Sequence, residues 1–131
     1  MTETNLDIAR SYFRAIRSGD LETVGKLLHD DVVWHQPGAN QFSGVREGRD
    51  AVFQMLGGMM EASQGSFAID EVRTLMGNGD LVAATIHFAG RHDQGSMAMD
   101  GVDLLRIKDG SIVEVWLFSG DPAAEDAFWG N

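Results

Sequence analysis

Residues 96–107 read Ser-Met-Ala-Met-Asp-Gly-Val-Asp-Leu-Leu-Arg-Ile, and this alternation is typical of a β-strand with one buried face. In an extended chain, one face of this stretch carries Met97, Met99, Gly101, Asp103, Leu105 and Ile107. Asp103 is the exception on that face, because an ionised and unpaired carboxylate among apolar side chains is costly. Asp103 is therefore the first candidate functional residue, and Gly101 beside it leaves room for another group to approach.

Two other arrangements of Asp103 stay open. Its carboxylate could pair with Arg73 or Arg106, or a bulge at Asp100-Gly101 could turn the side chain to solvent. A pocket position would raise its pKa by desolvation, so that it serves as a neutral donor or as a base near neutral pH. An ion pair would lower the pKa instead.

The rest of the chain predicts helices and strands arranged around this strand. Helical spacing covers residues 6–17, 21–29 and 48–63, a strand covers 31–36, and 39–47 is expected to be loop. Turn sequences rich in Gly, Asn and Asp separate four further strands at 67–76, 81–91, 96–107 and 111–119, and a short helix follows at 122–129. This order predicts an α+β fold with helices on one side of a curved, mostly antiparallel sheet.

Composition sets the class of protein. The chain has 131 residues, which suits a single domain spanning 1–131. Its net charge of -10 disfavours nucleic-acid and membrane-surface binding. It has no cysteine, no apolar run long enough to span a membrane and no secretory signal pattern at the N-terminus, so we expect a cytoplasmic protein.

Four segments together resemble one known family. They are the Ser-Gly-Asp at 18–20 with Leu28 to Gly38, the segment Gly44 to Val52, and the ending Asp109 to Trp116. This pattern resembles the SnoaL-like branch of the nuclear-transport-factor-2-like superfamily, which includes ketosteroid isomerase and polyketide cyclases. The resemblance implies a cone-shaped fold, with the sheet wrapped around three N-terminal helices and a deep pocket between them. It does not settle the chemistry.

The resemblance also implies roles for individual residues. Tyr12 matches the helix tyrosine that donates to the oxyanion in ketosteroid isomerase, and Asp103 matches the protonated aspartate beside it. The isomerase has an aspartate base before a proline at the end of the first strand, whereas this chain has Gln36 before Pro37. Glutamine cannot accept a proton, so Gln36 would orient a carbonyl or a water. Tyr12 could also be an ordinary core residue with a satisfied hydroxyl.

Strand alternation and the family register suggest the pocket walls. Trp34 lies on the Gln36 face of its strand and would form one wall, although it could equally be core. Met97 and Met99 would add a soft wall, and Val115 and Leu117 would line the pocket from the last strand. His35 is a possible catalytic group because histidine titrates near neutral pH, but alternation turns it away from Gln36.

We expect no metal and no cofactor. His29, Asp30, Asp31 and His35 are close in sequence but lack the helical spacing of a zinc protease motif. On the last strand, Ile112, Glu114, Trp116 and Phe118 would share the outer face of the sheet. An apolar patch there predicts a homodimer through the sheet.

These observations predict a pocket protein for a small hydrophobic molecule. The favoured hypothesis is a cofactor-free isomerase, cyclase or lyase that acts on a hydrophobic carbonyl compound by proton transfer, with Asp103, Tyr12 and Gln36 as catalytic residues. The alternative is a non-catalytic binder of a small apolar ligand, or a dimeric scaffold with a vestigial pocket. The absent base before Pro37 favours the alternative, and the buried carboxyl group favours the enzyme.

Overall fold

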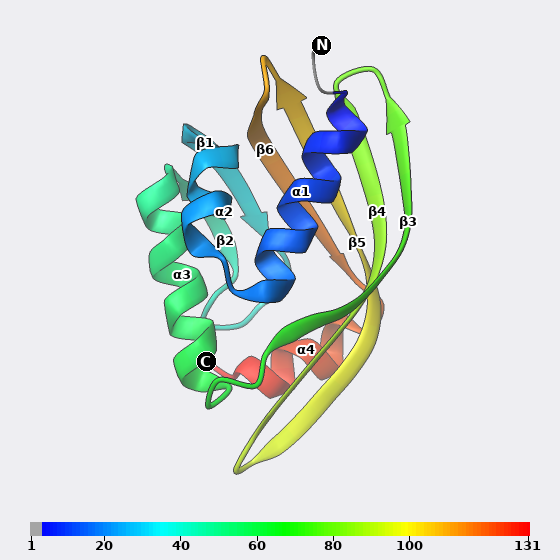
Figure 1. Ribbon diagram of the computed structural model, residues 1–131. Coiled ribbons are helices and arrows are strands. Elements are labelled where there is room, and N and C mark those ends of the chain that lie inside the picture. The colour runs from blue at the N-terminus through cyan, green and yellow to red at the C-terminus, as the bar shows by residue number, and fades with distance from the viewer. Residues whose placement is uncertain (1–3) are drawn as a thin grey trace.

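The computed structural model describes residues 4–131, in which helices cover one face of a curved six-stranded sheet (Figure 1). The helices are α1 (Asn5–Ser18), α2 (Leu21–Leu27), α3 (Arg49–Ala62) and α4 (Pro122–Trp129). The strands are β1 (Leu28–Gln36), β2 (Gly44–Glu47), β3 (Ala68–Asn78), β4 (Leu81–His92), β5 (Gly95–Lys108) and β6 (Ser111–Ser119). Their order in the sheet is β2-β1-β6-β5-β4-β3. The predicted α+β fold, with a mostly antiparallel sheet around the helices, is confirmed.

The ends of α1 explain its position in the sequence. Thr4 and Asp7 form a reciprocal capping box at its start. Gly19 ends the helix with φ of 75°, a left-handed conformation that glycine adopts without steric cost. Asp20 then accepts a hydrogen bond from the Thr23 backbone N–H at 3.2 Å and so begins α2.

The structure differs from the expected elements around β1. β1 begins at Leu28, so α2 is shorter than expected. Residues 44–47 were expected to be loop but form β2, an edge strand antiparallel to β1. Gly-Val-Arg-Glu carries no run of alternating apolar residues, and its pairing with β1 decides its conformation. β1 also pairs in parallel with β6, which brings the first and last strands side by side.

The register of β5 settles the orientation of Asp103. β4 and β5 pair without interruption from Leu81 opposite Arg106 to His92 opposite Gly95, so no bulge forms at Asp100-Gly101. The groups that approach Gly101 closely belong to the protein itself. A Cβ there would lie 2.7 Å from the Phe118 carbonyl oxygen and 2.9 Å from Phe88 Cε1, so the glycine allows close packing within the sheet.

A bulge in β6 changes the predicted outer face of that strand. Arg106 pairs with Glu114, and the next residue of β5, Ile107, pairs with Ile112, so Val113 is the extra residue. Ile112 therefore points inward and is fully buried, in contrast to the expectation that it shares a face with Trp116.

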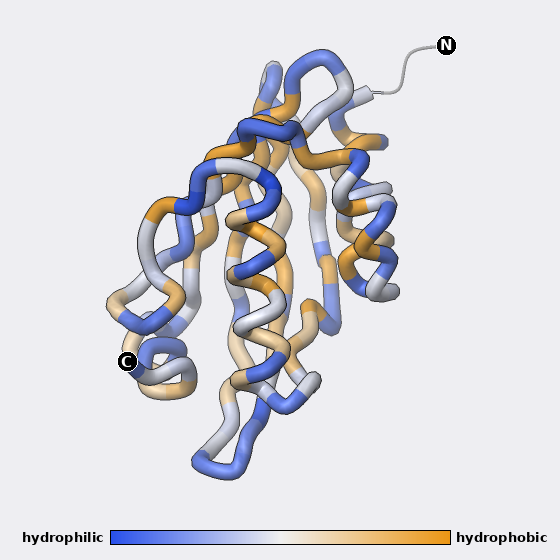
Figure 2. Tube along the Cα trace, turned by 90° about the vertical axis from the view of Figure 1, so that its left-hand side faces the viewer, coloured by the Kyte–Doolittle hydropathy of each residue, from blue (hydrophilic) through white to orange (hydrophobic). Residues whose placement is uncertain are grey.

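The core lies between the helices and the inner face of the sheet. Figure 2 shows the turns at the ends of the sheet as hydrophilic and much of the strand interior as hydrophobic. From α1, Tyr12 and Phe13 are buried, and from α3, Val52, Met55 and Met59. Within the described residues, no helix is both long and apolar enough to cross a bilayer.

Candidate functional site

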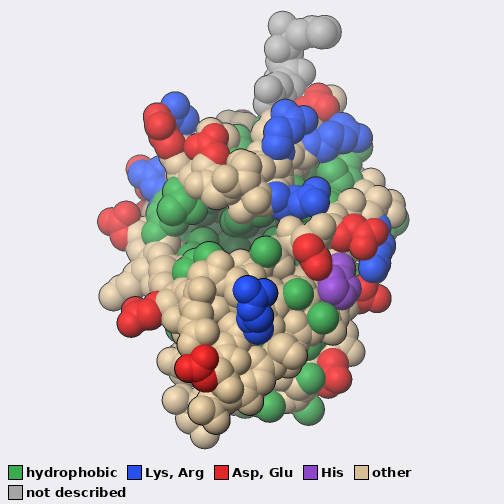
Figure 3. Space-filling view, turned by 60° about the horizontal axis from the view of Figure 1, so that its bottom comes forward, with side chains coloured by type: hydrophobic (Ala, Val, Ile, Leu, Met, Phe, Trp, Pro, Cys, Tyr) green, Lys and Arg blue, Asp and Glu red, His purple; other side chains and the backbone are tan. Residues whose placement is uncertain are grey.

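A cavity of about 450 Å³ opens between the helices and the inner face of the sheet. Figure 3 shows a hollow on this side of the molecule that is lined by hydrophobic side chains. The polar side chains on the cavity wall include Tyr12 of α1, Gln36 of β1, Asp103 of β5 and Glu125 of α4. Much of the remaining wall is apolar and comes from Ile16, Leu56, Met59, Phe67, Ile69, Ile86 and Phe88. Its size and composition are those of a small-molecule site.

Asp103 points into this cavity from the middle of the sheet. It lies opposite Ala84 of β4 and Leu117 of β6, and 6% of its surface is exposed. Burial raises its pKa to about 7, with a further contribution from the negative charge of Glu125. At neutral pH the carboxyl group is therefore present in both protonation states.

The two ion-pair alternatives for Asp103 do not occur. Arg73 pairs with Asp100 and Glu71. Arg106 lies 3.6 Å from an Asp80 carboxylate oxygen and 3.8 Å from Glu114.

Tyr12 faces the same cavity from α1 and is 1% exposed. Its pKa is raised by burial and by the negative charge of Asp103, so its hydroxyl stays protonated and can donate. Within residues 4–131, neither the Tyr12 hydroxyl nor the Asp103 carboxyl group has a hydrogen-bond partner. Both groups are therefore available to a ligand.

Gln36 completes the polar part of the site from β1. The Trp34 indole N–H donates to Gln36 Oε1 at 3.0 Å, and both side chains are buried. Because the amide oxygen takes that hydrogen bond, the Gln36 NH₂ group is the one left to serve the cavity as a donor.

Glu125 was missed by the sequence reasoning. It begins a buried stripe of α4 that continues with Phe128 and Trp129, three and four residues later. Trp129 Nε1 donates to Glu125 Oε2 at 3.1 Å. Burial raises the Glu125 pKa, while hydrogen bonds from Trp129 and Ser119 lower it. A carboxylate on the apolar face of a helix is the same signal that identified Asp103, and it could have found Glu125.

The predicted pocket walls divide into two groups. Trp34 and Leu117 line the cavity. Met97, Met99 and Val115 are buried but lie outside its lining, which corrects their predicted position. α4 packs against β5, and Phe128 of α4 approaches Gly90, the residue paired with Met97, so this end of the inner face is covered by protein.

His35 lies on the opposite face of β1, outside the cavity. Its Nε2 is 2.7 Å from Glu114 Oε2, and its ring stacks on Trp116 with centroids 5.4 Å apart. The possible catalytic role of His35 is therefore not supported by its position, because β1 continues its alternation up to Pro37. Within residues 4–131, no three His, Asp or Glu side chains gather closely enough to hold a metal ion.

The arrangement offers one titrating carboxyl group and two neutral donors around an apolar cavity. A carbonyl oxygen placed among Tyr12, Gln36 and protonated Asp103 would be polarised, and ionised Asp103 could accept a proton. Such groups gain strength from the low dielectric of a site shielded from water.

The comparisons with known proteins agree with this geometry. The SnoaL-like domain model matches residues 9–115. A crystal structure of a protein of unknown function from Xanthomonas campestris, described as having a cystatin-like fold, has 51% identity and a TM-score of 0.96 over 98% of this chain and 100% of that one. IdmH from Streptomyces antibioticus, described as a candidate polyketide cyclase, has 25% identity and a TM-score of 0.74 over 90% and 93% of the two chains.

Among curated proteins, an uncharacterized protein of Mycobacterium tuberculosis is 28% identical over 129 residues, 97% of each chain. Other solved structures of similar shape are described as NTF2-like proteins. The family match, the sheet order and the cavity beneath α1 all indicate the same kind of fold. The chain belongs to the SnoaL-like domain family.

Proposed function

We propose that this protein is a cofactor-free isomerase, cyclase or lyase that moves a proton on a small hydrophobic carbonyl compound bound in the cavity. The observation that carries the proposal is Asp103, an unpartnered carboxyl group with a pKa of about 7 in an apolar cavity. A group that titrates near the working pH is suited both to accept and to return a proton. The similarity to IdmH supports a substrate of the cyclase type.

In this proposal the ionised Asp103 carboxylate removes a proton from the carbon next to the carbonyl group. The electron pair of that C–H bond moves toward the carbonyl oxygen, where the Tyr12 hydroxyl and the Gln36 N–H group donate to the developing negative charge. Protonated Asp103 then returns the proton to carbon at the end of the rearrangement. The apolar wall excludes water and holds the hydrophobic body of the substrate.

A non-catalytic ligand-binding protein is the second candidate. Gln36 supports it, because its amide is held by Trp34 and cannot act as the base found at this position in ketosteroid isomerase. Under this alternative the same ligand binds but no proton moves.

Deuterium exchange separates the two candidates without knowledge of the natural substrate. 2-Tetralone, an apolar ketone with acidic protons next to its carbonyl group, is dissolved in D₂O near neutral pD, and loss of those proton signals is followed by NMR. The wild type should accelerate exchange over buffer, and Asp103→Asn should lose about a hundredfold or more of that acceleration. Asp100→Asn is the matched control, because Asp100 is an exposed carboxylate of the same strand that pairs with Arg73 outside the cavity.

Ketone binding is measured separately by chemical-shift changes. Binding without any exchange would replace the enzyme proposal with the ligand-binding one. Equal exchange by the wild type and Asp103→Asn would remove Asp103 from the mechanism.

A further inference from the structure

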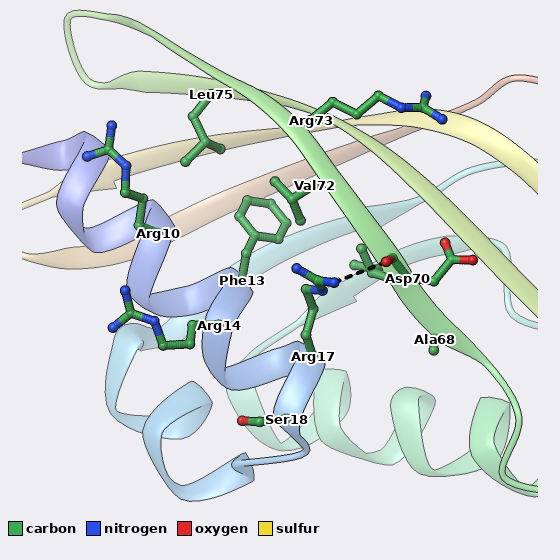
Figure 4. Close-up of a pocket in the computed structure, with 11 residues that line it drawn as sticks. Arg10, Phe13, Arg14, Arg17, Ser18, Ala68, Asp70, Val72, Arg73 and Leu75 are labelled. Carbon is green, nitrogen blue, oxygen red and sulfur yellow. Dashed lines mark hydrogen bonds between the residues drawn. The ribbon is translucent and has the colours of Figure 1, made fainter.

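A second hollow lies beside the cavity, between α1 and β3. This arginine groove has a volume of about 800 Å³ and is shown in Figure 4. Its apolar floor includes Phe13, Val72 and Leu75, and its rim carries Arg10, Arg14 and Arg17 of α1. Arg17, Ser18, Ala68 and Ile69 line both the groove and the cavity, so the two hollows share a wall. A ligand in the cavity could therefore extend into the groove.

The groove concentrates positive charge on an acidic protein. The chain has 10 Lys and Arg residues against 20 Asp and Glu. Arg10, Arg14 and Arg17 follow one another at spacings of four and three residues, so they share one face of α1. Figure 3 shows Lys or Arg side chains grouped beside the hydrophobic hollow. Three cations on one helix face repel each other unless an anion lies among them.

The partners of these arginines within residues 4–131 show which of them can hold a ligand. Arg10 lies 3.1 Å from an Asp7 carboxylate oxygen, so its positive charge is partly neutralised by this ion pair. Arg14 has no hydrogen bond and no ion pair among the described residues. The arginine contacts found on α1 are those of Arg10 and Arg17. Arg17 Nη2 donates to the Asp70 backbone oxygen at 3.0 Å, and its other N–H groups have no acceptor among the described residues (Figure 4).

The other charged groups of the groove are already engaged. The Asp70 carboxylate lies 2.7 Å from His87 Nδ1. Arg73 also lines the groove, but its guanidinium is directed away from α1 in Figure 4 and pairs with Asp100 and Glu71. The free donors therefore come from Arg14 and Arg17, and Arg17 lies where the groove and the cavity meet.

We propose that the ligand is an elongated carboxylate, with its apolar body in the cavity and its carboxylate in the arginine groove, held by Arg17 and Arg14. A guanidinium group already oriented by one hydrogen bond can receive a carboxylate with two parallel N–H donors. The apolar floor of the groove suits the hydrocarbon next to the carboxylate. This inference rests on the proposed function only in placing the ligand in the cavity, and it holds whether or not Asp103 moves a proton.

The test compares two ligands of equal length that differ in charge. N-phenyl-1-naphthylamine, a neutral dye that fluoresces in apolar surroundings, reports occupation of the cavity. Dodecanoate and 1-dodecanol, each below its aggregation concentration, then compete with the dye. The wild type should prefer dodecanoate, and raising the salt concentration should reduce that preference, because exposed charges are screened.

Two arginine variants locate the effect. Arg17→Gln and Arg14→Gln should each weaken dodecanoate competition by up to about fivefold, and should leave dodecanol competition unchanged. Arg91→Gln is the matched control, because it removes the same charge from an exposed side chain outside both hollows. Leu117→Trp, which fills the cavity, should abolish the dye signal and show that the dye reports on the cavity.

The outcomes separate this inference from the proposed function. If dodecanoate and dodecanol displace the bound dye from the wild type equally well, the groove does not bind the carboxylate. The assignment of the cavity as a binding site would be unaffected. A carboxylate preference that survives both arginine substitutions would also overturn the role of the arginine groove. The proposed function fails by a different result, the absence of deuterium exchange.

Discussion

The Trp34 indole N–H and the Gln36 amide oxygen lie 3.0 Å apart in the interior of the protein. This hydrogen bond fixes the orientation of an amide that would otherwise rotate, and it leaves the Gln36 NH₂ group as a donor for the cavity. It also means that the end of β1 carries a bound amide where ketosteroid isomerase carries a base.

Replacing this amide by a carboxylate should increase proton transfer. Gln36→Asp supplies a group that can accept a proton near Asp103, and we expect faster deuterium exchange of 2-tetralone than in the wild type. Gln36→Asn, which has the same length but cannot accept a proton, is the control and should show no gain. Equal rates for the two variants, with ketone still bound, would mean that this end of β1 does not reach the reacting carbon.

The raised pKa of Asp103 predicts how stability depends on pH. The folded state holds this proton up to about pH 7, whereas the unfolded state releases it near its ordinary value of about 3.9. Stability from the protonated group is fully present below the unfolded pKa and is lost as the pH rises through the folded pKa. Relative to Asp103→Asn, the wild type should lose up to about 1.4 kcal/mol per pH unit within that interval.

Urea unfolding of both proteins from about pH 2 to about pH 8 measures this difference. Asp100 provides a comparison of opposite sign, because the hydrogen bond from Arg73 lowers its pKa. Relative to Asp100→Asn, the wild type should keep its advantage at neutral pH and lose it as the pH falls through the lowered pKa. A wild type that gains on Asp103→Asn as the pH rises would show that Asp103 is ion-paired in solution.

We also predict that the protein is a homodimer through the outer face of the sheet. Phe118 is 55% exposed on β6, and Trp116 on the same strand is only half-buried beside it. Phe118→Glu and Trp116→Glu should each yield monomers in sedimentation experiments at micromolar concentration. Leu21→Glu is the control, because Leu21 is an equally exposed apolar residue on the helical side. A wild type that sediments as a monomer would contradict this prediction.

Two neighbouring glycines of α3 should respond differently to alanine. A Cβ at Gly57 meets no atom within 4 Å, so Gly57→Ala should stabilise the protein by about 0.5–1 kcal/mol through helix propensity. A Cβ at Gly58 would lie 3.0 Å from Phe42 Cε1, and the Phe42 ring packs on Trp129. Gly58→Ala should therefore gain less or lose stability. The midpoints of urea unfolding measure both effects, and equal gains would show that the Phe42 ring moves freely.

Much of the fold could be predicted because its signals are local. Helical spacing, capping residues such as Asp20 and the turn residues between strands mark most elements to within a few positions. β2 could not be predicted, because its four residues become a strand only by pairing with β1. Ile112 points inward because β6 contains an extra residue. A prediction from strand alternation alone does not detect such a bulge and assigns the residues before it to the wrong face.

The candidate site was predictable where an isolated polar residue interrupts an apolar pattern. Asp103, Tyr12 and Gln36 do line one cavity, and the same pattern in α4 could have identified Glu125. The positions of Met97 and Met99 could not be predicted, because α4 covers that end of the sheet and strand alternation does not reveal it. The groove beside α1 depends on the distance between α1 and β3, which no local pattern encodes.

The parallel pairing of β1 with β6 has a consequence for folding kinetics. The strand that carries Trp34 and Gln36 is held in place by Val115 and its neighbours, which lie far from it along the chain. Contacts between such distant parts of a chain close slowly, because the intervening loop must first lose entropy. The cavity therefore cannot form on a nascent chain before β6 has left the ribosome, and until then the apolar face of β1 lacks its neighbouring strand.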